Sequence, residues 1–329
     1  MKIDIHNHYY PPEYLKEVEA SSKNTVLKRD EQDRLLLVYS GDYNIVLKSH
    51  YDPEERIRMM DENGLDMQVL TMTTPGVDIE EPSYGVKLSE IINDAMAEVI
   101  RKYPDRFSAL ATLPMKDSKA AVKELERSVE ELGLPGAMIF TNVVGEPIDS
   151  KRFWPIYEEA EQLEAPIMIH PTSPTEIGLM DPYRLVPLIG FPFETTVAIS
   201  RLVFSGVLEK YPNLKLILSH LGGTVPYLAE RIDRGYFAYP ECKGILTKAP
   251  SEYFKKTYMD VVSFYPPAIE FAIKFLGAEK LLLGSDYPHQ IGDVALSIET
   301  IRNLNLQDDD KEKIMGNNAL SLFKIEENT

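Results

Sequence analysis

Five residues of the types that bind metal ions each follow directly after a short apolar stretch of the sequence. Imidazole is the commonest metal ligand in proteins, and carboxylates share that role. Two histidines one residue apart are a weak signal alone, because such a pair also occurs on protein surfaces. The prediction of a metal site therefore depends on where the other residues fall. In chain order the five are His6, His8, His170, His220 and Asp286.

Strand and helix patterns alternate along the chain after a first strand at the N-terminus. Short apolar runs predict eight strands, and a helical pattern follows each of them. This alternation is typical of a parallel sheet, and eight units close into a (β/α)8 TIM barrel of the α/β class. An open doubly wound sheet is the alternative. The predicted strands cover residues 3–5, 67–71, 107–112, 137–140, 167–170, 214–219, 257–261 and 281–285.

The five candidate residues stand at the carboxyl ends of four predicted strands, namely the first, fifth, sixth and eighth. In a barrel all these strand ends open on one face, and that face holds the active site. Each residue alone is explained equally well as a hydrogen-bonded histidine or a helix-capping aspartate. Their common position favours a single site instead. Of the six histidines in the chain, only His50 lies outside these strand ends.

Two segments depart from the regular alternation. Residues 9–51 precede a helix that Asp52 caps, and they predict an insertion over the mouth of the barrel. The apolar run 34–39 within it indicates a strand, and with it a small hairpin. Residues 171–211, after the fifth strand, predict a longer connection with a helix near 193–204. We expect one domain over residues 1–329.

The composition of the chain limits the kinds of binding partner and the cellular compartment that we expect for the protein. The chain has 329 residues, is 44% hydrophobic and carries a net charge of −17. Such an acidic chain is a poor match for a nucleic-acid backbone or an anionic membrane surface, so a small-molecule substrate is expected. Cys242 is the only cysteine, which excludes an intrachain disulfide and indicates a reducing, cytoplasmic compartment. No run of 18 apolar residues predicts a membrane span.

Several motifs resemble those of the amidohydrolase superfamily, in its amidohydrolase-2 branch: "IDIHNHYYPP", "MIHP", "SHLGG" and "LGSDYPH". The branch includes the 2-amino-3-carboxymuconate-6-semialdehyde decarboxylases, which "DPEERIRMMDENGLDMQVLT" and "GFPFETTVAI" also resemble. The similarity extends over nearly the whole chain. It implies a metal-dependent enzyme on a barrel scaffold and an assembly into homodimers.

The resemblance implies a role for each of the five residues. One divalent metal, Zn²⁺ or alternatively Mn²⁺, would be held by His6, His8, His170 and Asp286. His220 would act as acid or base beside a metal-bound water, and Asp286 would share that duty. Three neutral imidazoles and one carboxylate suit zinc. A second metal would need a carboxylate or modified lysine near the end of the fourth strand, and residues 136–141 contain neither.

The resemblance also implies a reaction, the non-oxidative decarboxylation of an aromatic or dienoic carboxylate. The same residues would equally suit a hydrolase acting on an ester, lactone, amide or carbon–carbon bond, and the ligand set does not separate the two. The carboxymuconate enzymes hold substrate carboxylates with two arginines, whose positions here are Asn44 and Tyr239. An aromatic or smaller monocarboxylate is therefore expected, because bidentate arginine pairing is lost.

Further residues are candidates for the pocket without a decisive pattern. Lys48 or Arg184 would replace the missing arginines, and His289 would stand behind a metal ligand or cap its own loop. A barrel kept as a binding module is disfavoured because all five site residues are present. A structural zinc site is disfavoured because such a site normally has a closed set of four ligands away from a cleft. Aromatic residues near strand ends that suit either the pocket or the core are Tyr10, Phe193, Phe264 and Tyr287.

Overall fold

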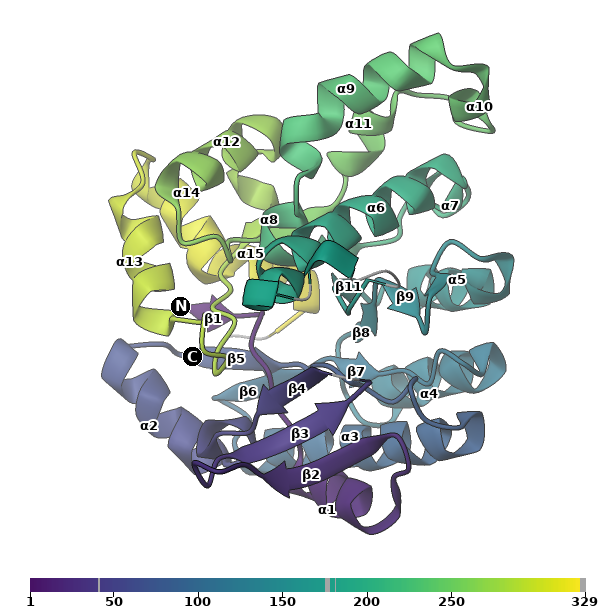
Figure 1. Ribbon diagram of the computed structural model, residues 1–329. Helices are drawn as coiled ribbons and strands as arrows, with labels where there is room; N and C mark the ends of the chain where they lie inside the picture. The colour runs from purple at the N-terminus through teal and green to yellow at the C-terminus, as the bar shows by residue number, and fades with distance from the viewer. Residues whose placement is uncertain (41, 175–177, 181, 326–329) are drawn as a thin grey trace.

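The protein was studied as a computed structural model that describes residues 1–40, 42–174, 178–180 and 182–325. Its centre is a ring of short parallel strands in eight consecutive positions, of which β6 and β7 share one (Figure 1). These strands are β1 (Ile3–Asp4), β5 (Met67–Leu70), β6 (Phe107–Ala109), β7 (Ala111–Thr112), β8 (Ala137–Phe140), β11 (Ile167–His170), β12 (Leu216–Leu218), β13 (Tyr258–Asp260) and β14 (Leu281–Leu282).

Hydrogen bonds close this ring. β1 pairs with β5 and β5 with β6, while β7, β8, β11, β12, β13 and β14 pair in that order, all in parallel. The last junction joins β14 to β1, where the Ile5 N–H donates to the Leu283 carbonyl at 2.9 Å. A bridge between Asn7 and Tyr287 continues the same junction. The predicted (β/α)8 barrel is therefore confirmed, and the open doubly wound sheet is wrong.

Buried apolar side chains explain why these short segments form strands. Every residue of β5, β8 and β11 is buried, as expected for parallel strands that are covered on both faces. β12 begins two residues after and ends one residue before the predicted limits of the sixth strand. The reason for the earlier end lies in the next turn, Ser219–Gly222, where His220 and Leu221 adopt left-handed backbone angles of 54° and 56° in φ. This turn directs His220 away from the strand.

Helices on the outside of the ring connect the strands. Asp52 caps α2 as predicted, because its carboxylate accepts from the Glu54 and Glu55 N–H groups, and Gly64 ends this helix with φ 58°. The connecting helices are α2 (Pro53–Asn63), α3 (Pro82–Lys102), α4 (Ser118–Glu130), α5 (Trp154–Gln162), α9 (Val225–Ala238), α10 (Pro240–Lys243), α11 (Pro250–Phe254), α12 (Pro266–Leu276), α13 (Val294–Asn303), α14 (Asp308–Glu312) and α15 (Asn318–Phe323).

The segment after β1 is more ordered than the sequence indicated. It begins with α1 (Pro12–Ser21), which the sequence analysis did not predict because no polar side chain caps its start. Three antiparallel strands follow, β2 (Thr25–Arg29), β3 (Leu35–Tyr39) and β4 (Asp42–Ile45), rather than a two-stranded hairpin. Figure 1 shows α1 and this small sheet, in purple, on one side of the barrel.

The connection after β11 contains the predicted helix. A π-helical turn, Val186–Gly190, runs directly into α6 (Phe191–Phe204), and α7 (Val207–Lys210) follows. Taken together, Val186–Phe204 is long and apolar enough to cross a membrane by length and composition alone. Here its buried face packs against α11 and the turn after β12. Several of its apolar side chains remain exposed, namely Leu188, Ile189, Phe193 and Val197.

Candidate active site

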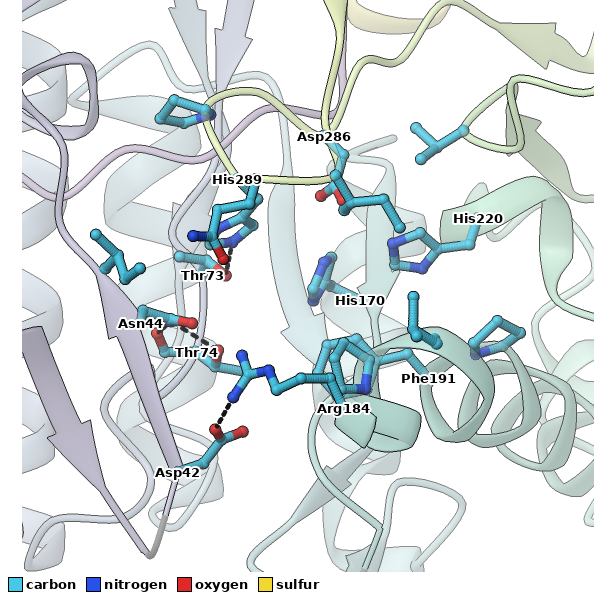
Figure 2. A pocket seen from close by; sticks show the side chains of 18 of the residues that line it. Asp42, Asn44, Thr73, Thr74, His170, Arg184, Phe191, His220, Asp286 and His289 are labelled. Carbon is cyan, nitrogen blue, oxygen red and sulfur yellow. Dashed lines mark hydrogen bonds and ion pairs between the residues drawn. The ribbon is translucent and has the colours of Figure 1, made fainter. Parts of the chain in front are cut away.

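The strand ends bring the five predicted residues into one cluster, and three of them, His170, His220 and Asp286, line the inner end of a pocket (Figure 2). His6 and His8 follow β1, His170 ends β11, His220 follows β12 and Asp286 follows β14. Neighbouring histidine rings in the cluster lie 4.9–5.4 Å apart between centroids. The barrel therefore places side chains from four distant parts of the chain within reach of one ion.

The geometry of the cluster fits a bound metal. One oxygen of Asp286, Oδ1, lies 2.9 Å from His8 Nε2 and 3.6 Å from His6 Nε2. Two ligands of a tetrahedral zinc ion lie about 3.3 Å apart, so both separations suit donors that share an ion. Ligand atoms of four residues, His6, His170, His220 and Asp286, lie within 4.8 Å of one another. His8, Asp286 and His289 form a second such group.

Unpaired nitrogens point to the same conclusion. His6 and His170 each use Nδ1 for a hydrogen bond, to Asp260 and to the Pro171 carbonyl respectively. Their Nε2 atoms are buried and have no hydrogen-bond partner. A buried polar atom without a partner is costly, whereas a metal ligand whose other nitrogen is held by an oxygen is the usual arrangement in proteins. These two imidazoles are therefore oriented as ligands.

Asp260, at the end of β13, organises the cluster from below and was missed by the sequence analysis. Its Oδ2 contacts His6 Nδ1 at 2.5 Å, and its two oxygens accept from the backbone N–H groups of His220 and Leu221 at 3.1 Å. One carboxylate thus orients a ligand and also stabilises the left-handed turn that carries His220. A signal was available, because residue 260 is an aspartate at a predicted strand end.

Burial and neighbouring charges set the protonation of the cluster. Burial holds the pKa of His8 and that of His170 well below their usual range, so both imidazoles are neutral, as metal binding requires. Burial opposes ionisation of Asp286, but the surrounding histidines, His6 foremost, hold the pKa of its carboxyl below the ordinary value. Burial also lowers the pKa of His220, which His6 lowers further.

A network of fully buried polar side chains supports the two loops that carry the ligands. Arg56, from α2, donates to the His8 carbonyl at 2.7 Å, to the Ser49 carbonyl at 2.9 Å and to Asn7 Oδ1 at 2.5 Å. Its Nε donates to Gln68, which in turn donates to Asp4. The network therefore reaches from the outer helix to the first strand.

Asp4 joins this network to the loop that carries Asp286. Its carboxylate accepts from the Ser285 N–H at 3.1 Å and from the Ser285 hydroxyl at 2.7 Å. It also accepts from the His6 N–H at 3.2 Å. The same buried carboxylate thus holds the backbone beside both candidate ligands, His6 and Asp286, and links the two loops.

The pocket above the cluster has a volume of about 510 Å³, enough for a small aromatic ligand. His170, His220 and Asp286 line its inner end, whereas His6 and His8 lie beneath and do not line it. His220 is the histidine of the five that keeps appreciable exposure. The side walls come from the inserted sheet and from the connection after β11, and they include Asn44, Thr74, Arg184, Phe191 and Phe264.

The remaining candidates divide between pocket and packing. Phe264 and Arg184 line the pocket, but Lys48 pairs with Asp52 and Glu55 and does not line it. Phe193 is an exposed side chain of α6 outside the pocket lining, and the Tyr287 ring packs 5.2 Å from the Arg56 guanidinium.

The last three residues to place are His289, His50 and Tyr239, the last of which stands where the carboxymuconate enzymes have their second arginine. His289 lines the pocket, contacts Thr73 Oγ1 at 3.2 Å and lies 4.5 Å from the His8 ring. His50, which the sequence placed apart, is buried with its ring 5.4 Å from that of His289. Tyr239 is 61% exposed and does not line the pocket, so it does not replace a substrate-binding arginine within this chain.

Comparisons with known proteins give one consistent picture. A family model described as amidohydrolase matches residues 3–325. The chain is 33% identical to a 2-amino-3-carboxymuconate-6-semialdehyde decarboxylase of Dictyostelium discoideum, over all of this chain and 93% of the relative. It is also 33% identical to a gamma-resorcylate decarboxylase of a Polaromonas species, over 83% of this chain and 87% of that one.

Solved structures agree with these matches. A 5-carboxyvanillate decarboxylase from Sphingomonas paucimobilis superposes with a TM-score of 0.81 at 29% identity, over 84% of each chain. A dihydroxybenzoic acid decarboxylase from a Polaromonas species, crystallised with manganese and 2-nitroresorcinol, gives a TM-score of 0.82 at 28% identity. That superposition covers 98% of this chain and 96% of the other.

Proposed function

The chain belongs to the amidohydrolase family, and from that premise we propose that it is a metal-dependent, non-oxidative decarboxylase of an aromatic or dienoic carboxylate. The observation that carries the proposal is the buried cluster of His6, His8, His170 and Asp286 beneath a pocket of aromatic size. Relatives that decarboxylate dihydroxybenzoate, carboxyvanillate and carboxymuconate semialdehyde support the reaction class.

We assign the metal to His6, His8, His170 and Asp286 and leave His220 free for proton transfer. The alternative, in which His220 is a ligand in place of His8, is favoured by the 4.8 Å grouping of His220 with the other three. Two observations support our assignment. The His8 Nε2 to Asp286 contact is the shortest contact between candidate ligands, and His220 alone keeps appreciable exposure toward the pocket. A bound divalent metal would act as a Lewis acid on oxygen atoms of the substrate.

The chain's own residues account for the remaining steps. Phe191 and Phe264 provide apolar contacts that orient a flat substrate and displace water from the inner end of the pocket. His220 delivers a proton to the ring or diene carbon that bears the carboxylate. The bond between that carbon and the carboxylate then breaks, its electron pair restores the π system of the ring or diene, and CO₂ leaves. The proton thus replaces CO₂, and no oxidant is needed.

We propose Zn²⁺ as the native ion, with Mn²⁺ as the alternative. The donor set of imidazoles and one carboxylate supports zinc, and the manganese bound in the Polaromonas enzyme supports the other choice. Elemental analysis of the purified protein tests the assignment. Less than about half an equivalent of divalent metal, even after reconstitution, would contradict a mononuclear site.

We also propose a cytoplasmic homodimer. The exposed apolar side chains Ile189, Phe193 and Val197 of Val186–Phe204 support a protein interface there, because exposed apolar side chains are favoured at interaction sites. The single cysteine and the net charge of −17 suit a reducing, aqueous compartment. Light scattering of the purified protein gives the oligomeric state, and fractionation of the source cells gives the location.

The decisive experiment for the reaction is a mass-spectrometric screen of the metal-loaded protein. The panel contains aromatic and dienoic carboxylates together with esters and lactones. Loss of CO₂ from a carboxylate is expected. Gain of water without loss of CO₂ would instead show a hydrolase on the same site and would contradict the proposed reaction.

A further inference from the structure

One side chain in the pocket wall has a hydrogen-bond acceptor to which none of the described residues donates. Asn44, in β4, lines the pocket, and Figure 2 shows it on the side of the cavity opposite His220. Its Nδ2 lies 2.7 Å from the Thr74 carbonyl, 3.1 Å from the Thr74 hydroxyl and 2.8 Å from the Tyr10 hydroxyl, so its two hydrogens are shared among these three acceptors. A carbonyl can only accept, so the amide NH₂ must face Thr74.

The neighbouring hydroxyl groups hold the amide in this orientation. The Tyr10 hydroxyl donates to the Thr74 carbonyl at 2.6 Å, and the Tyr39 hydroxyl donates to Thr74 Oγ1 at 2.8 Å. The hydrogens of both phenols are therefore committed, and Tyr10 is left to accept from Asn44. Among the described residues, none donates to Asn44 Oδ1, although the side chain is only partly buried. The oxygen is thus a fixed acceptor that remains available to a ligand.

The charge of the same wall argues against a second carboxylate on the ligand. Within the described part of the chain, Arg184 is the one lysine or arginine that lines the pocket. Its Nη1 already pairs with Asp42 Oδ1 at 3.0 Å (Figure 2). A ligand carboxylate here would face the Asn44 oxygen, which repels it, and a cation whose charge is already balanced. A hydroxyl or amino group would instead donate to that oxygen.

We propose that Asn44 determines specificity by accepting a hydrogen bond from a hydroxyl or amino substituent of the substrate. The substrate class is then a monocarboxylate that carries a neutral donor, and a dicarboxylate is disfavoured. This inference rests on the proposed function, because it places the reacting carboxylate of the substrate at the metal cluster and the donor substituent at Asn44.

Binding of matched ligands to the metal-loaded protein tests the proposal without requiring turnover. Isothermal calorimetry compares benzoates that carry a hydroxyl or a methyl group at each ring position, together with the benzenedicarboxylates. For one ring position, the hydroxyl compound should bind the wild-type protein about tenfold more tightly than its methyl counterpart. In N44L this ratio should fall to about one. A ratio that persists in N44L, or tightest wild-type binding by a dicarboxylate, would overturn the proposal.

Two further variants separate specificity from structural damage. Y39F removes a hydrogen bond of the same network without removing the acceptor, so it should weaken hydroxyl and methyl ligands by the same factor. N44R replaces the acceptor with a cation and should shift the preference toward a dicarboxylate. If N44L does not fold, N44A provides the same comparison, because only the ratio between two ligands reports on the acceptor.

Release of CO₂ from the same compounds is measured separately. A tenfold binding ratio without CO₂ from any ligand would contradict the decarboxylase assignment and leave the role of Asn44 intact. If CO₂ is released but the binding ratio is the same in the wild-type protein and in N44L, the decarboxylase assignment stands and the proposed role of Asn44 is wrong.

Discussion

The floor of the pocket and its rim are held by different kinds of polar contact. We define the floor as His6, His8, His170, Asp260 and Asp286, and the rim as Asp42, Asn44 and Arg184. No floor residue exceeds 5% exposure, and the Asp286 side chain is 8% exposed. At the rim, the exposed fractions of the Arg184 and Asp42 side chains are 50% and 26%.

This difference separates chemistry from specificity. At the floor, each side chain is fixed by a second buried group, as Asp260 fixes His6, so a change there disturbs several atoms that cannot reach water. At the rim, water can replace a lost partner, and the cost is correspondingly small. The floor should therefore tolerate little substitution, whereas the rim can change with the substrate.

The largest effects are expected from two histidines of the cluster, His170 and His220, which differ in their assigned roles. H170A should lose the metal and with it all turnover, because His170 Nε2 has no other partner. H220A should keep about one equivalent of metal and lose turnover by roughly 100- to 10,000-fold, as expected for a general acid. Elemental analysis and CO₂ release measure the two properties. Loss of metal from H220A would make His220 a ligand.

The second effect concerns the network beneath the floor. R56A leaves the Asn7, His8, Ser49 and Gln68 oxygens without their donor, so the free energy of unfolding should fall by about 3–5 kcal/mol. Urea unfolding at constant metal concentration measures it. Arg58 lies on the same helix with an exposed side chain, and R58A should change stability by less than about 0.5 kcal/mol. An equal decrease in the free energy of unfolding in R56A and R58A would show that the buried network stabilises the protein no more than an exposed ion pair does.

A buried carboxyl outside the floor, that of Asp78, tests whether burial alone makes a charged side chain lower the free energy of unfolding. Burial raises the pKa of Asp78 to about 7, against 3.8 as the ordinary value. The folded state therefore binds more protons than the unfolded state between these pH values, and stability falls as pH rises. Relative to wild type, D78N should gain about 2–3 kcal/mol between pH 5 and pH 8. Urea unfolding at both pH values checks this, and a constant difference would contradict it.

A smaller effect is expected from the carboxylate behind His6. D260N keeps the shape of the side chain but removes the charge that orients His6 and stabilises the turn of His220. Metal affinity, measured by competition with a chelator, should weaken about 10- to 100-fold. D117N provides the control, because Asp117 only caps α4. Unchanged affinity in D260N would show that the ligands orient themselves.

The smallest effect is expected at the rim. D42N removes the partner of Arg184 without burying a charge, so stability should change by less than about 1 kcal/mol. The freed guanidinium should bind benzenedicarboxylates a few-fold more tightly, which calorimetry can measure. A loss of metal or of several kcal/mol in this variant would remove the distinction between floor and rim.

Much of the architecture follows from local signals in the sequence. β8 and β11 have the predicted limits, because a fully buried parallel strand appears as an unbroken apolar run. The start and end of α2 follow from Asp52, Pro53 and Gly64, whose preferences are local. α1 and the three-stranded form of the insertion were not predicted, because packing against the barrel stabilises them more than any cap or turn residue.

The barrel, the five residues at its strand ends and their chemical type can be predicted from the chain alone, because strand period and residue identity are local properties. The surroundings of these residues depend on tertiary packing. Asp260 lies 254 positions from His6, and Asn44 meets Thr74 across 30. No local pattern predicts such contacts. The orientation of each ligand and the free acceptor in the pocket therefore emerge only when distant segments pack together.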